Sequence, residues 1–288
     1  MKKRFFTGII IAIVYVGTVL LSLLVHPVFF DIFTMLVMIA AVLEVSRAIG
    51  ERFGRPLDPL VITGVLLGYL AFVLANYFLN GKGGVAIWYG VLIVLIVMSL
   101  VYVRLSKEKT MRNVTSTLLV IIYPVTLLMY MLALNYLPET LRVPSILLLF
   151  LVSTLTDTFA YLVGSTFRGP KLCPVISPKK TVSGAIGGLL GGTLGGALVL
   201  VCSLYGFLNV EFIGRTLGTN IAHFLVLGFV GSLFNQVGDI VASYVKRLCG
   251  IKDYGNILPG HGGVMDRIDG MMLTGVFLYM YMLVLTVL

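Results

Sequence analysis

Mostly apolar runs follow one another along the chain, and each is long enough to cross a bilayer as a helix. Nine such runs lie at about 5–25, 28–46, 59–80, 85–103, 115–136, 143–164, 182–206, 221–245 and 264–288. A bilayer core about 30 Å thick needs about 20 apolar residues in a helix. The linkers are short, and none is of low complexity. The pattern predicts an all-α polytopic membrane protein of about nine transmembrane helices, in a single integral membrane domain 1–288.

Composition and charge placement agree with this fold class. Hydrophobic residues make up 59% of the chain, charged residues 11%, and the mean hydropathy is +1.05, which excludes a soluble globular domain. With nine spans, 18 of the 21 Lys and Arg residues fall on the side of the N-terminus. They are Lys2, Lys3, Arg4, Arg47, Arg52, Arg55, Arg104, Lys107, Lys109, Arg112, Arg168, Lys171, Lys179, Lys180, Lys246, Arg247, Lys252 and Arg267. Only Lys82, Arg142 and Arg215 fall opposite, so we expect a cytoplasmic N-terminus and a C-terminus outside.

The remaining totals restrict the partners. A formal net charge of +9 favours an anionic membrane surface or anionic ligands. No extended soluble basic segment is present, so nucleic acid is not expected as a partner. Cys173, Cys202 and Cys249 lie far apart in no metal or redox spacing, which predicts free thiols. The first apolar run is too long for a signal peptide and lacks a small-residue cleavage site, so we interpret it as a membrane helix.

The first five spans carry little chemistry, and residues 1–140 have no clear role. Asp31 and Glu44 lie near the ends of the second span and are expected at the membrane interface rather than in a functional site. Pro124 should kink the fifth span, because proline lacks the N–H of the helical ladder. The candidate chemistry lies in the last four spans, residues 143–288.

The sixth span becomes polar midway, where Ser153, Asp157 and Tyr161 share one helical face. An aspartate at the centre of a membrane helix costs about 2.5–3.5 kcal/mol, so Asp157 should face a cavity or a partner. The alternative is a packing role in which Asp157 pairs with a neighbouring Arg or Lys.

A basic, proline-rich loop from Arg168 to Thr181 follows, and it is either an ordinary cytoplasmic loop or part of a binding site. Its candidate substrate-binding residues are Lys171, Ser177, Lys179, Lys180 and Thr181. The seventh span then carries two glycine rows: Gly184, Gly188, Gly192 and Gly196, and Gly187, Gly191 and Gly195. Small residues in rows let helix backbones approach closely, either within the chain or across a homodimer.

The last two spans bring more acids together. Asp239, Ser243 and Lys246 lie on one face of the eighth span, and Asp266 and Asp269 lie one turn apart at the start of the ninth. A short connection makes these spans antiparallel neighbours, so the three acids should converge, with Asp157 joining from the sixth span. Four uncompensated acids would cost roughly 10–14 kcal/mol. Carboxylates without cysteine or clustered histidine suit a hard ion, which predicts Mg²⁺.

The connection itself has the features of an anion site. Gly262 and Gly263 stand at a helix N-terminus, where free N–H groups and the helix dipole favour a phosphate. His261 is placed to donate to a phosphate oxygen or to carry a proton. Further cationic donors are Lys246, Arg247, Lys252 and Arg267. Acidic metal ligands beside phosphate-binding cations predict phosphoryl or nucleotidyl transfer, without a covalent enzyme intermediate.

The segment Ser243–Asp269 reads SYVKRLCGIKDYGNILPGHGGVMDRID, which resembles the signature of the phosphatidate cytidylyltransferase family. The ISPKKT segment from Ile176 to Thr181 resembles that family too, as does Asp157 with Ala160, Tyr161 and Gly164. One departure is Ser183, where the family pattern has an acidic residue. The resemblance covers about 155–270, whereas the first five spans match only in hydropathy.

The resemblance implies that CTP and phosphatidate react to CDP-diacylglycerol and pyrophosphate with Mg²⁺. Asp239, Asp266 and Asp269 would hold the ion, and Asp157 would support it or a second cation. Lys246, Arg247, Lys252 and Arg267 would neutralise developing charge, with His261 placed more for positioning than for catalysis. The other substrate-binding candidates in the signature are Ser243, Asp253, Gly262 and Gly263.

The absence of soluble domains and of a targeting sequence favours the cytoplasmic membrane of a prokaryote. The active site would face the cytoplasm, phosphatidate would arrive from the inner leaflet and CTP from the cytoplasm. Two other readings stay open: a related CTP-using polyprenol or lipid kinase or transferase, and an ion-coupled secondary transporter.

Overall fold

The structure, a computed structural model, describes residues 2–79, 83–106, 110–207 and 213–287. Of the charges counted above, Lys82, Lys107 and Lys109 lie outside the described residues. The helices are α1 (Lys2–Leu24), α2 (Val28–Phe53), α3 (Asp58–Phe78), α4 (Gly84–Leu105), α5 (Met111–Val120), α6 (Leu127–Leu134), α7 (Glu139–Phe167), α8 (Val182–Leu204), α9 (Leu217–Leu248) and α10 (Met265–Val287). All nine predicted runs are helical, and the fifth is divided into α5 and α6.

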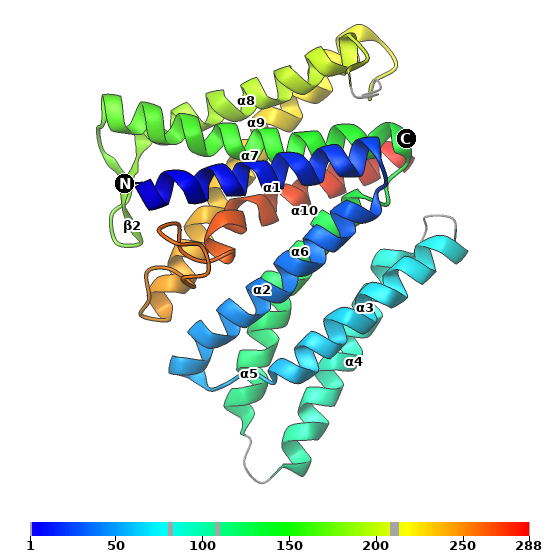
Figure 1. The fold of residues 1–288 in the computed structure, drawn as a ribbon, viewed down its shortest axis with the longest axis vertical. Helices are drawn as coiled ribbons and strands as arrows, with labels where there is room; N and C mark the ends of the chain where they lie inside the picture. The colour runs from blue at the N-terminus through cyan, green and yellow to red at the C-terminus, as the bar shows by residue number, and fades with distance from the viewer. Residues whose placement is uncertain (1, 80–82, 107–109, 208–212, 288) are drawn as a thin grey trace.

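Eight helical segments of the described chain are long and apolar enough to cross a membrane, and α1 adds a further apolar helix. This confirms the predicted all-α polytopic membrane protein. The start of α1 and the β-hairpin described below lie at one side of the molecule (Figure 1), and the end of α10 lies at the opposite side. An odd number of crossings gives this arrangement.

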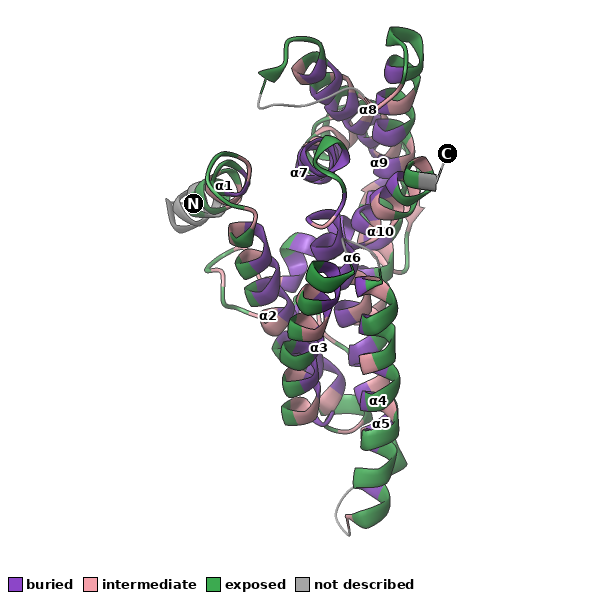
Figure 2. Cartoon of the chain, turned by 90° about the vertical axis from the view of Figure 1, so that its right-hand side faces the viewer, coloured by how far each residue is buried: buried purple, intermediate pink, exposed green. Residues whose placement is uncertain are grey.

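The fifth span contains the predicted irregularity at Pro124, as a short π-helical segment, η1 (Ile121–Thr126), between α5 and α6. The wider turn accommodates a residue that cannot donate to the ladder. The Thr126 hydroxyl donates to the Ile121 carbonyl at 2.9 Å and satisfies one of the acceptors in this turn. After it, α6 is buried on all sides at the centre of the molecule (Figure 2), as its uniformly apolar sequence requires.

The basic loop is more ordered than the sequence predicted, because it forms an antiparallel hairpin. Strand β1 (Lys171–Cys173) pairs with β2 (Ser177–Thr181). Thr181 then caps α8, since its hydroxyl accepts a hydrogen bond from the Gly184 N–H at 3.1 Å. Ser183, the departure from the family pattern, donates its hydroxyl hydrogen to the Arg168 carbonyl and ties the two ends of the hairpin together.

Both glycine rows of α8 are used for packing within the chain. The row of Gly187, Gly191 and Gly195 faces α7, where a methyl group at Gly195 would lie 3.0 Å from the Val152 backbone. In the other row, Gly188, Gly192 and Gly196 face α9, with 3.0 Å to the Gly228 backbone at Gly196, whereas Gly184 packs against Ala160 of α7. The packing role of the rows is confirmed, and α8 is held between α7 and α9. The three cysteines are free thiols, as predicted.

Candidate active site

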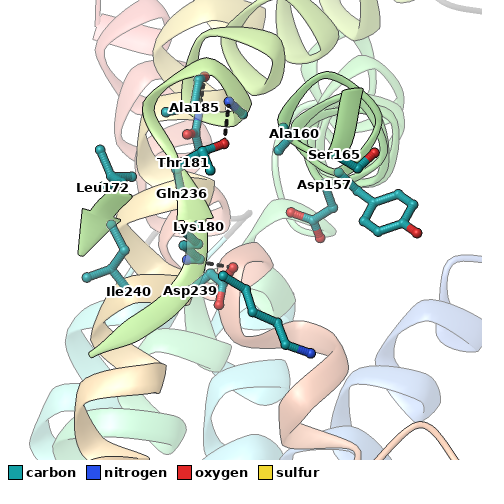
Figure 3. Close-up of a pocket in the computed structure, with 14 residues that line it drawn as sticks. Asp157, Ala160, Ser165, Leu172, Lys180, Thr181, Ala185, Gln236, Asp239 and Ile240 are labelled. Carbon is teal, nitrogen blue, oxygen red and sulfur yellow. Dashed lines mark hydrogen bonds and ion pairs between the residues drawn. The ribbon is translucent and has the colours of Figure 1, made fainter. Parts of the chain in front are cut away.

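A cavity of about 330 Å³ lies between α7, the hairpin, α8 and α9. We call it the polar cavity; the charged side chains that line it are Asp157, Lys179, Lys180 and Asp239. In Figure 3 the Asp157 carboxylate points from α7 towards the space beside Lys180 and Asp239. The structure therefore joins the polar stretch of the sixth span, the basic loop and the eighth span in one site, as the sequence predicted.

Opposite charges meet in this cavity. The Lys180 ammonium lies 2.7 Å from Asp239 Oδ2, with 23% and 35% of the two side chains exposed. Asp157 instead accepts a hydrogen bond from the Asn235 amide at 2.8 Å. The alternative in which Asp157 pairs with a basic residue is not found among the ion pairs of the described chain.

A second charged cluster surrounds Lys246, which follows Asp239 along α9. Its ammonium lies 2.8 Å from Asp266 Oδ1 and 3.5 Å from Asp269 Oδ2, and all three side chains are largely buried. The ammonium also lies 5.4 Å from the centre of the Tyr254 ring, a cation–π contact. The predicted packing of the last two spans is confirmed, but of the three acids only Asp266 and Asp269 meet at Lys246, whereas Asp239 pairs with Lys180.

The other oxygen of Asp266 holds the α9–α10 connection. Asp266 Oδ2 accepts the Tyr254 N–H at 2.8 Å and the Gly263 N–H at 2.9 Å. Burial raises the pKa of the Tyr254 phenol above its usual range, and the neutral hydroxyl donates to the Ala242 carbonyl at 3.4 Å. Asp266 thus organises the connection as well as facing Lys246.

Glu44 of α2 belongs to this site, and the sequence analysis missed it. Its side chain is not interfacial but 2% exposed, and its two oxygens accept the Val264 N–H at 3.0 Å and the Met265 N–H at 2.8 Å. The free N–H groups expected beside Gly262 and Gly263 are therefore taken by carboxylates of the protein. The helix dipole that would attract a phosphate attracts Glu44 equally well. The one sequence signal was the cost of an acid inside an apolar run.

The remaining predicted residues lie around these clusters. Arg247 is exposed and donates to the carbonyls of Ile176 and Ile251, both at 3.3 Å, which links the hairpin to the α9–α10 connection. Lys252 is exposed, and Asp253 lines a separate cavity with Arg47 and Glu51 of α2.

Four further predicted residues lie on α9, on the hairpin and in the α9–α10 connection. Ser243 is buried on α9, while Lys171 and Ser177 sit on the hairpin strands. His261 is partly buried, and its Nδ1 has no hydrogen-bond partner among the described residues.

The acidic residues provide an all-oxygen donor set. In the described part of the chain no three of them gather tightly enough to form a ready-made metal cluster. Asp157 and Asp239 nevertheless line one cavity, and Asp269 lies on α10 facing Lys246 of α9. The buried Asn235 Oδ1 beside Asp157 has no hydrogen-bond partner in the part of the chain that the structure describes. The ammonium groups of Lys246 and Lys180 lie against two of these three carboxylates, at the positions where a metal cation would be held. Carboxylate and amide oxygens of this kind fit a hard divalent cation.

A family model described as the cytidylyltransferase family matches residues 6–285. The chain belongs to the cytidylyltransferase family. The match includes the first five spans, which hydropathy alone could not assign.

Curated relatives agree with this family membership. Proteins named phosphatidate cytidylyltransferase from Rickettsia conorii and Brucella abortus biovar 1 are 37% identical over 135 residues and 39% identical over 137 residues. These alignments cover 47% and 48% of this chain, and 56% and 46% of the relatives. A relative of the same name from Staphylococcus haemolyticus is 43% identical over 128 residues, 44% of each chain. This cytidylyltransferase family member thus spans about half the length of the curated relatives it matches.

Proposed function

We propose that this protein is a CTP:phosphatidate cytidylyltransferase of phospholipid biosynthesis, which transfers CMP from CTP to phosphatidate. The observation that carries the proposal is the polar cavity, where Asp157, Lys180 and Asp239 meet at one end of a bundle of apolar helices. Family membership and the printed names of the relatives support it. A membrane site with both acids and lysines suits two phosphate-bearing substrates, one lipid and one soluble.

The reaction needs little proton transfer. A phosphatidate phosphate oxygen, already anionic, attacks the α-phosphorus of CTP and forms a new P–O bond. The bond from the α-phosphorus to the oxygen bridging to the β-phosphorus breaks, and pyrophosphate leaves with that electron pair. Lys179, Lys180 and Arg247 are exposed enough to bind the triphosphate. Their charges would neutralise the transition state, which is where phosphoryl-type transfer gains most of its acceleration.

Mg²⁺ is the proposed cofactor. Asp239, Asp266 and Asp269 would hold it, and Asp157 with Asn235 would support it or a second cation. When bound, it would neutralise the CTP phosphates. Because Lys246 already lies between Asp266 and Asp269, its ammonium would have to move aside or share these oxygens.

The site is proposed to face the cytoplasm of a cytoplasmic membrane, with the N-terminus inside and the C-terminus outside. The basic hairpin and α9–α10 connection support this through the positive-inside rule. The spans α7–α10 would be the catalytic part, and α1–α6 the part that supports it.

A direct assay tests the proposal. Purified protein with CTP, long-chain phosphatidate and Mg²⁺ should release pyrophosphate and form CDP-diacylglycerol in equal amounts, and chelation by EDTA should stop both. Diacylglycerol and a polyprenol serve as alternative acceptors. No pyrophosphate with any phosphatidate would overturn the proposal, and phosphorylation of diacylglycerol or polyprenol would reassign the protein to the lipid kinases.

A further inference from the structure

A second cavity, of about 570 Å³, lies between α1, α7 and α10. We call it the α1–α7 cavity. Most of its wall is apolar: Tyr15, Val16 and Leu20 of α1, and Leu147, Phe150 and Leu151 of α7. Figure 2 shows α1 at the outside of the molecule, and the Tyr15 ring of α1 meets the Phe150 ring of α7 edge to face at 5.1 Å between ring centres. Since both helices are apolar spans, an apolar space between them is accessible from the hydrocarbon of a bilayer.

One end of this cavity is charged. Asp157 and Arg267 line it there, and Asp157 also lines the polar cavity, so the two cavities meet at this residue. The Arg267 side chain is exposed and forms none of the ion pairs found in the described chain. Ser153 also lines the cavity and is 2% exposed. Its hydroxyl has no hydrogen-bond partner among the described residues. Unpaired polar groups at the end of an apolar cavity indicate a ligand with a polar head and an apolar tail.

We propose that the α1–α7 cavity binds one acyl chain of phosphatidate, with Arg267 receiving the phosphate at the charged end. This inference rests on the proposed function. A lipid bound there would have its chain between α1 and α7 and its phosphate beside Asp157, where the polar cavity holds the lysines that would bind CTP. The first helix would then form one wall of the lipid site, a role that its hydropathy does not reveal.

The chemistry of the walls favours this occupant over another protein segment. Apart from the Tyr15, Ser153, Thr154 and Thr158 hydroxyls, the side chains of the wall away from the charged end offer no hydrogen-bonding groups for a peptide backbone, whereas an acyl chain needs none. The Arg267 guanidinium at the charged end suits a phosphate monoester, because an arginine supplies several hydrogen-bond donors at once. Alkyl chains also tolerate imperfectly filled apolar space, which a folded protein segment does not.

The test uses side chains that fill the cavity and two substrates that differ only in their tails. Leu151→Trp on α7 and Val16→Trp on α1 should each lower kcat/KM for dioleoyl phosphatidate at least about tenfold, because a filled pocket excludes methylene groups. Turnover of dihexanoyl phosphatidate should fall clearly less, since its short tails fill less of the cavity. Ile13→Trp is the matched control, one turn from Val16 on α1 and 64% exposed outside the cavity.

Equal losses on both lipids, or no loss on either, would overturn the inference. If the unmodified protein turns over neither lipid, the proposed function fails instead. In that case the cavity assignment is tested by the retention of dioleoyl phosphatidate, measured by native mass spectrometry in detergent. Retention by the unmodified protein and Ile13→Trp but not by Leu151→Trp would support the cavity assignment, and equal retention by all three would end it.

Discussion

Carboxylates on the helices have different partners in the two halves of the molecule. In α7–α10, Asp239 pairs with Lys180 and Asp266 and Asp269 face Lys246, while Asp157 accepts a hydrogen bond from the Asn235 amide. In α1–α6 the buried acids have no lysine or arginine within ion-pair distance among the described residues. Asp31 instead accepts hydrogen bonds from the Asn135 amide and the Tyr136 hydroxyl, both at 2.8 Å. Glu44 accepts two backbone N–H groups of the α10 start.

This difference separates carboxylates whose partners can be exchanged from carboxylates whose partners are fixed. A lysine side chain is long and mobile, so it can leave a carboxylate when a phosphate or a cation arrives. Backbone N–H groups and packed amides cannot move in this way. The C-terminal half therefore has acids whose partners can be exchanged during a reaction, and the N-terminal half has acids that fix positions. Glu44 connects the two, because it fixes the helix that carries Asp266 and Asp269.

The largest expected effect comes from removing the lysine that faces two acids. Lys246→Met leaves Asp266 and Asp269 buried without their cation, and breaking a buried pair costs about 3–5 kcal/mol. The free energy of unfolding in detergent micelles should fall by that amount. Arg104→Met, at the exposed end of α4, is the control and should change it by no more than about 0.5 kcal/mol. An unchanged stability for Lys246→Met would mean that the acids are not charged in the folded protein.

Asp239→Asn should reduce activity more than stability. The side chain is 35% exposed and its partner Lys180 remains solvated, so folding should change little. Loss of a charged group that holds reacting phosphates or a cation costs about 100- to 1,000-fold in kcat. Pyrophosphate release measures it, with thermal unfolding as the folding control. Near-normal turnover in this variant would remove Asp239 from the site.

Glu44→Ala tests whether a residue of the N-terminal half positions the catalytic helix. Two N–H groups lose their acceptor, at about 1–3 kcal/mol for each buried donor left unsatisfied. The apparent Mg²⁺ affinity should fall about 10- to 100-fold, as is usual when a support of metal ligands is removed. Glu44→Gln keeps one acceptor oxygen and should recover part of both losses.

Asp31→Asn is the matched comparison for Glu44, because it alters a buried acid that contacts no part of α10 in the hydrogen bonds found. It should lower stability and leave the Mg²⁺ dependence unchanged. Equal shifts of Mg²⁺ dependence in both variants would show that Glu44 acts only through general stability.

The smallest effect is expected at the Arg142–Glu139 pair. The Glu139 side chain is 85% exposed and the pair is 3.9 Å apart. Arg142 is only 11% exposed, but a long contact to a solvated carboxylate contributes at most about 1 kcal/mol, so Glu139→Gln should lower stability by no more than that and leave turnover unaltered. Thermal unfolding and pyrophosphate release together check this.

Sequence reasoning found what local periodicity encodes. Apolar runs located the spans, glycine spacing predicted close packing of α8, and helical faces brought Lys246, Asp266 and Asp269 together. Contacts between distant segments were not predictable in this way. Glu44 meets Val264 across 220 residues of sequence, and no periodic pattern connects them. The N–H groups of Val264 and Met265 are predicted to be free because the segment alone does not reveal the distant acid that caps them, whereas Asp266 of the same segment caps the Gly263 N–H.

The use of both glycine rows of α8 has a consequence for how copies of the protein can associate. The side of α8 that remains outward carries Ile186, Leu190 and Leu194, which are 55%, 63% and 41% exposed. These branched side chains hold a neighbouring helix at a distance, whereas tight membrane dimers form through small residues. The small residues of α8 are therefore not available for self-association, and changes in the glycine rows should appear as folding defects rather than as altered stoichiometry.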